Sequence, residues 1–167
     1  MQNKRARIRP SVSSRIKRVL GRLKDSTGTS MVETALITPL LLLTTFAVMD
    51  FACLFYVYLA LENGVGQATR YGVTGNLVAG KTREESIMAA MKDATPTLTI
   101  GDGAFAFSHL PPGSNVWLGG AGGPNDVEKV TVNYQWTLLT PLVQPFFPGG
   151  QITLTVESAM KNEPRFN

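Results

Sequence analysis

A long run without formal charge, from Thr34 to Met49, constrains this chain more than any other feature of its sequence. The run comprises sixteen residues, and its apolar character resumes after Asp50 with FACLFYVYLAL before Glu62. A helix from Val32 to Met49 would be roughly 27 Å long at about 1.5 Å per residue, close to the bilayer hydrocarbon thickness of about 30 Å. The run continues into bulky residues, whereas a cleavable secretory signal has a small-residue site there. The sequence therefore predicts one transmembrane helix.

A cationic leader precedes this run. Residues 1–28 carry nine Lys or Arg residues against Asp25 alone, a net charge of +8, so the remaining 139 residues sum to −4. Because segments rich in Lys and Arg stay on the cytoplasmic side, we expect a cytoplasmic N-terminus and a translocated C-terminal part. The positive charge is confined to one arm without interleaved aromatic residues, which argues against nucleic acid as a partner.

The rest of the chain is typical of a small mixed domain. Thr82 and Glu85 form a capping-box pattern ahead of SIMAAMKDA, which predicts a helix. Short alternating runs at 104–107 and 115–118 flank a Pro-Pro-Gly turn and suit a hairpin, and VEKVTVNYQW and ITLTVES alternate as strands do. We therefore expect an α+β fold, in which a long N-terminal transmembrane helix extends into a small antiparallel-sheet domain. The expected parts are a leader at 1–28, a transmembrane and stalk helix at 29–75, and a translocated domain at 76–167.

Motifs for catalysis or metal binding are missing. His109 is the only histidine, and the sequence contains no HExxH, CxxC or GxSxG pattern. GGAGG at 119–123 lacks the Lys-Ser or Lys-Thr of a phosphate-binding loop. We expect no enzymatic activity, no metal and no cofactor, and we expect His109 to be a surface residue of the hairpin.

Three regions resemble a known family. In the first, the basic leader ends in Gly28, Glu33 is the fifth residue after it, and an apolar helix follows. The others are VMDFACLFYVYLALENGVGQATRYG and the C-terminal ITLTVESAMKNEP. With these features the chain resembles a TadE-like minor pilin, or pseudopilin, of the tight-adherence (Flp) type IVb pilus systems. Major pilins of these systems share the glutamate but carry Tyr where this chain has Thr34, and they are far shorter, so the resemblance is to a minor subunit.

The resemblance implies a subunit of the bacterial inner membrane that supports assembly or initiation of a pilus used in surface adherence. It implies cleavage by a prepilin peptidase between Gly28 and Thr29, with other major and minor pilins and the Tad assembly platform as partners. It also implies that Glu33 neutralises the α-amino group of a neighbouring processed subunit. The alternative for Glu33 is that it is simply an acid placed favourably near a helix N-terminus, an effect of about 0.3–1 kcal/mol. For the whole chain, the alternative is an uncleaved single-pass membrane protein whose outer domain binds another envelope component.

Two further features have two interpretations each. Asp50 lies either solvated at the outer membrane interface, or in a helix–helix contact between subunits, since a charge with apolar surface on both sides usually has a partner. The loop TLLTPLVQPFFPGG is unusually apolar for a connection, and it either completes the domain core or forms an interface with another pilin or the membrane surface. The residues concerned are Leu138, Leu139, Leu142, Val143, Phe146 and Phe147.

Overall fold

The computed structural model describes residues 26–164, with side chains from residue 28. The chain divides into two compact units, Met1–Thr44 and Thr45–Asn167. In its described part, the first unit consists of the N-terminal portion of helix α2 (Ser26–Val73). The second unit contains the remainder of that helix and all of the sheet.

Helix α2 ends at Val73, two residues before the expected end at residue 75. Gly75 has φ of 71°, a left-handed conformation that favours glycine, and its N–H donates to the carbonyl of Gly72. The N–H of Glu163 donates to the carbonyl of Val73 at 3.0 Å, so the end of the chain returns to the end of this helix.

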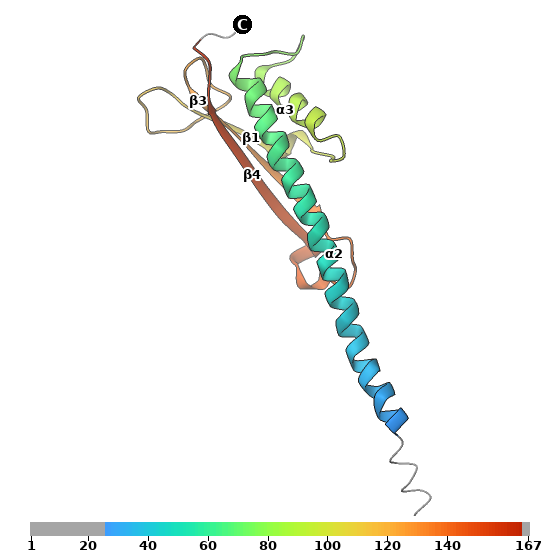
Figure 1. Ribbon diagram of the computed structural model, residues 1–167. Coiled ribbons are helices and arrows are strands. Elements are labelled where there is room, and N and C mark those ends of the chain that lie inside the picture. The colour runs from blue at the N-terminus through green and yellow to red at the C-terminus, as the bar shows by residue number, and fades with distance from the viewer. Residues whose placement is uncertain (1–25, 165–167) are drawn as a thin grey trace, which may run out of the picture. The chain divides into compact units, whose positions relative to one another are not determined.

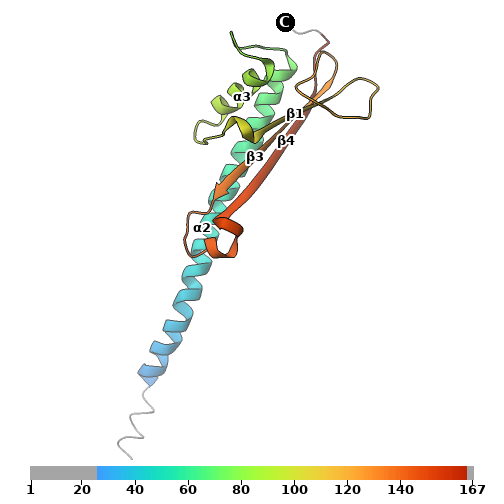
Figure 2. The same ribbon diagram turned by 180° about the vertical axis from the view of Figure 1, so that it is seen from behind.

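Helix α3 (Arg83–Ala94) begins with the predicted capping box. The Thr82 hydroxyl accepts from the Glu85 N–H, and the Glu85 carboxylate accepts from the Thr82 N–H. The helix lies beside the C-terminal part of α2 in both views (Figures 1 and 2). Gly64 of α2 marks the close approach, because an added Cβ there would lie 2.5 Å from the Thr95 methyl group.

The sheet has four antiparallel strands in the order β2-β1-β3-β4. They are β1 (Phe105–Leu110), β2 (Leu118–Gly119), β3 (Val127–Thr137) and β4 (Gln151–Lys161). The long β3–β4 hairpin pairs Val127 with Lys161 at one end and Thr137 with Gln151 at the other. This architecture confirms the expected fold class of a long apolar helix followed by a small antiparallel sheet.

One face of α2 in the second unit covers the sheet. Its buried apolar residues recur at helical spacing: Leu54, Val57, Leu61, Val65 and Ala68. They share a core with Ile87 and Met91 of α3 and with the inward-facing valines of β3 and β4. Strands β3 and β4 run alongside this part of α2 (Figure 1). The alternation predicted for both strands is confirmed, because Val130, Val132, Leu154 and Val156 are buried.

Candidate functional site

The predicted cleavage junction lies in the first turn of α2. Gly28 and Thr29 are both helical and exposed. The helix was expected to begin near Thr29, and in the described chain it already includes Ser26. A single glycine costs a helix only about 1 kcal/mol, and helix ends are defined to within one or two residues. The proposed scissile bond therefore lies in a helical terminus with open space around the Cα of Gly28.

Glu33 lies one turn further along and is exposed. Among residues 26–164, no Lys, Arg or His side chain forms an ion pair with it. Its carboxylate is thus accessible to a group outside the described chain.

The apolar half of α2 presents its side chains outward. Large apolar residues between positions 31 and 49 are mostly exposed: Met31, Val32, Leu36, Ile37, Leu40, Leu41, Leu42, Val48 and Met49. The segment is long and apolar enough to cross a membrane. Residues 28–49, as α-helix, span roughly 33 Å. This one candidate span in the described chain is consistent with a single-pass membrane protein.

Asp50 ends the apolar segment and is 1% exposed, so it is not the solvated interface residue that one interpretation gave. One carboxylate oxygen accepts from the N–H of Leu139 at 2.8 Å, and the other accepts from the N–H of Thr140 at 3.2 Å. The partner of this acid is therefore the β3–β4 loop of the same chain, which neither interpretation anticipated. The helix–helix contact between subunits stays a prediction.

The β3–β4 loop divides its apolar residues between two environments. Leu138 and Val143 are buried at 2% and 4% exposure, whereas Leu139, Leu142 and Phe146 are 62%, 52% and 69% exposed. Phe147 is half-buried and makes an edge-on contact with Phe51 of α2, with ring centroids 6.5 Å apart. The loop thus contributes Leu138 and Val143 to the interior and leaves an apolar surface, and the interface interpretation of that surface stays a prediction.

A buried ion pair that the sequence analysis missed joins α3 to the sheet. Arg83 Nη2 lies 2.7 Å from Glu128 Oε2, and the Glu128 side chain is fully buried. The guanidinium also donates to the carbonyls of Gly72 and Gly122. Position 128 has the same parity as Val130 and Val132, so alternation places it on the core face. That signal was available, but acids are rarely buried without a partner.

Burial dominates the electrostatics of Glu128. Desolvation raises the pKa of this carboxyl to about 7, although the positive charge and hydrogen bond of Arg83 act in the opposite direction. Gly72 lies directly over the pair, because an added Cβ would be 2.9 Å from both carboxylate oxygens. The cluster therefore connects the end of α2, the start of α3 and β3 through one arginine.

His109 lies in the predicted hairpin, where it pairs with Leu118 of β2. Its side chain is only 17% exposed, so the expectation of a surface residue was wrong. Its Nδ1 lies 3.1 Å from the carbonyl of Gly120. Its Nε2 is 3.9 Å from Asp126 Oδ2, an oxygen that also accepts from the Gly123 N–H. The histidine therefore helps to order the glycine-rich loop against β1.

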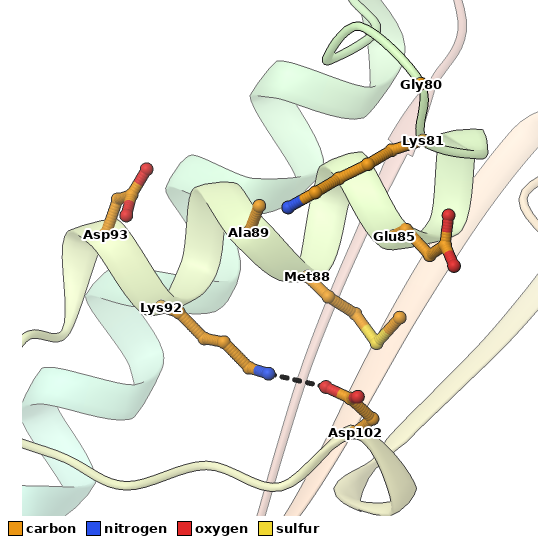
Figure 3. Close-up of a pocket in the computed structure, with 8 residues that line it drawn as sticks. All are labelled: Gly80, Lys81, Glu85, Met88, Ala89, Lys92, Asp93 and Asp102. Atoms are coloured by element: carbon orange, nitrogen blue, oxygen red, sulfur yellow. Dashed lines mark hydrogen bonds and ion pairs between the residues drawn. The ribbon is translucent and has the colours of Figure 1, made fainter.

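A shallow depression on α3 has charged residues of both signs around it (Figure 3). Lys92 pairs with Asp102, and this hydrogen bond holds the pKa of Asp102 below its ordinary value. The hydrogen bond from the Thr82 backbone likewise lowers the pKa of Glu85, which belongs to the helix cap. Within residues 26–164, no group of three or more His, Cys, Asp or Glu side chains is arranged to hold a metal ion. Two of the acids that line the depression thus already have local roles, Glu85 in the helix cap and Asp102 in the ion pair with Lys92.

Comparison with known families gives one match. Residues 28–70 match the model of the family described as TadE-like protein. No curated protein and no solved structure shows a significant match to the chain. The match covers helix α2 from its first turn almost to its end, and it confirms the resemblance drawn from the leader junction and the apolar segment.

Proposed function

From the TadE-like sequence of residues 28–70, we propose that this chain is a minor pilin or pseudopilin of a tight-adherence (Flp) type IVb pilus system. Helix α2 anchors it in the bacterial inner membrane as a single-pass protein. The cationic leader stays in the cytoplasm, and the sheet domain is translocated to the periplasmic side or beyond. The observation that carries the proposal is that the matched segment coincides with a helix whose first part exposes apolar side chains and whose second part carries a folded domain.

The subunit is processed by a prepilin peptidase between Gly28 and Thr29. Removal of the leader takes away a net charge of +8 and leaves a chain that begins immediately before the apolar segment. The open space around Gly28 and its exposed position support access by a protease. Once processed, the subunit joins other major and minor pilins and the Tad assembly platform, and it supports assembly or initiation of the pilus.

Mass spectrometry of the membrane-inserted protein tests this proposal. Co-expression with an active prepilin peptidase is expected to yield a protein that begins at Thr29. A peptidase with its catalytic residues replaced is the control, and it should leave the leader in place. Retention of the 28-residue leader with the active enzyme would contradict the proposal and favour the alternative, an uncleaved membrane protein whose outer domain binds another envelope component.

A further inference from the structure

The β3–β4 loop exposes apolar side chains in a region without charge. Leu139, Leu142 and Phe146 are each more than half exposed, and prolines at 141, 145 and 148 are exposed between them. The sequence contains no Asp, Glu, Lys or Arg between Lys129 and Glu157. In a water-facing loop, such a surface is unusual and marks an interaction site.

The charges of the β3–β4 hairpin lie at the opposite end. In the strand register, Lys129 pairs with Ala159 and Glu157 pairs with Thr131, whereas the loop end begins at the neutral pair of Thr137 and Gln151. The charged residues of the hairpin therefore lie far from the loop, as expected if the loop end lies at an apolar boundary.

Asp50 and Phe51 fix this loop to α2. The two backbone hydrogen bonds to the Asp50 carboxylate hold residues 139 and 140. Phe147 packs edge-on against Phe51. All of these residues belong to the second unit of the chain, so the loop is held at one defined level of the helix.

The loop is attached to α2 at the point where the apolar segment of the helix ends. Residues 28–49 span roughly 33 Å as α-helix, and a hydrocarbon core is about 30 Å thick. Asp50 follows directly, so a helix that crosses the membrane leaves the hydrocarbon region near this residue. A loop attached there lies at the membrane surface.

We propose that the exposed apolar side chains of the β3–β4 loop insert into the interfacial region of the lipid bilayer. This inference rests on the proposed membrane span. The lipid surface is favoured over a protein partner because the loop is attached at the end of the span, so lipid is present at this level before any partner arrives. Asp50 is the positioning residue, since its buried carboxylate accepts the hydrogen bonds of the loop backbone and holds the loop at the level where the apolar segment ends.

Fluorescence quenching in vesicles tests the proposal. The purified full chain, with Cys53→Ser and Phe146→Cys, is labelled with an environment-sensitive fluorophore. It is then reconstituted in phosphatidylethanolamine–phosphatidylglycerol vesicles at high dilution. Lipids with a nitroxide near the headgroup are expected to quench the probe several-fold more strongly than they quench one at Val116→Cys. Val116 is a suitable control because it is equally apolar and exposed, at 63%.

A third probe separates this inference from the proposed membrane span. Leu40 is 65% exposed in the apolar segment, and a probe at Leu40→Cys should be quenched by lipids that carry the nitroxide deep in the acyl chain. Failure at Leu40 would overturn the span itself. Quenching at Leu40 with an unquenched probe at Phe146 would overturn the lipid-inserting loop alone. A probe at Phe146 with blue-shifted emission and no quenching would instead indicate a contact with a second copy, which also contradicts the proposal.

Discussion

The carboxylate of Asp50 accepts a hydrogen bond from the backbone N–H of Leu139, 89 residues later in the chain, at 2.8 Å. With the second bond from Thr140, this acid anchors a loop that also packs against the same helix through Phe147.

Asp50→Ala is expected to lower the free energy of unfolding by roughly 2–4 kcal/mol, because two backbone N–H groups lose a charged acceptor. Chemical denaturation in detergent, followed by tryptophan fluorescence, measures the change, since Trp136 is half-buried in the sheet. Asp93→Ala is the control, because Asp93 is exposed on α3 and its loss should change stability by less than about 0.5 kcal/mol. Equal stability of the two variants would show that the loop does not depend on Asp50.

Two glycines of α2 provide a matched pair. An added Cβ at Gly72 would meet Ile87 Cδ1 at 2.8 Å and the Glu128 carboxylate, whereas one at Gly66 would meet nothing within 4 Å. Gly72→Ala should therefore destabilise the protein by about 1–3 kcal/mol. Gly66→Ala should stabilise it by roughly 0.5–1 kcal/mol, since alanine favours the helix. Thermal denaturation of both variants checks the opposite signs, and a stabilising Gly72→Ala would show that the packing is looser than described.

Glu128 makes stability depend on pH. Its pKa is raised by burial from an ordinary value of 4.5 to about 7, so the folded state holds a proton that the unfolded chain releases between these values. The contribution of Glu128 to the free energy of unfolding is therefore present in full below about pH 4.5, and it is lost as the pH rises through 7. A shift of this size corresponds to at most about 3 kcal/mol.

Melting temperatures of the wild type and Glu128→Gln between pH 5 and pH 8 test this dependence. Glutamine stays neutral, so the wild type should lose stability relative to the variant as the pH rises. All other ionisable groups are the same in both proteins, so the difference between the two curves reports Glu128. Parallel curves would contradict the raised pKa.

Glu33→Ala tests the assembly contact. If Glu33 neutralises the α-amino group of a neighbouring processed subunit, the variant should insert and be processed normally but lose most incorporation into the pilus or its assembly complex. Glu157→Ala removes an exposed acid from β4 and serves as the control. Crosslinking or co-purification with the other pilins gives the readout, and incorporation equal to that of the control would exclude the pairing.

Local patterns predicted much of the fold. The alternation in residues 127–136 and 152–158, the capping box at Thr82 and the apolar segment each depend on neighbours in sequence. The structure has them as expected, although β4 extends further, to Lys161. The partners of Asp50 escaped prediction because they are 89 and 90 residues away and are backbone amides, which carry no sequence signal. The burial of Glu128 was not predicted because it depends on a partner, Arg83, that lies 45 residues earlier in the chain.

The first part of the β3–β4 loop still follows the strand alternation. Leu138 has the same parity as Val130 and Val132 and is buried, whereas the adjacent Leu139 is exposed. The hydrogen bonds from residues 139 and 140 to Asp50 carry no such local signal.

The bond between Glu163 and Val73 bears on the timing of export. If the domain is translocated as proposed, it emerges from its helix outward, and β4 follows β3. Until β4 pairs with β3, the inner face of α2 lacks its full cover, because the pairings that bury it connect distant parts of the chain and form late. On that proposal, a newly exported domain stays open to chaperones and proteases until β4 has crossed the membrane.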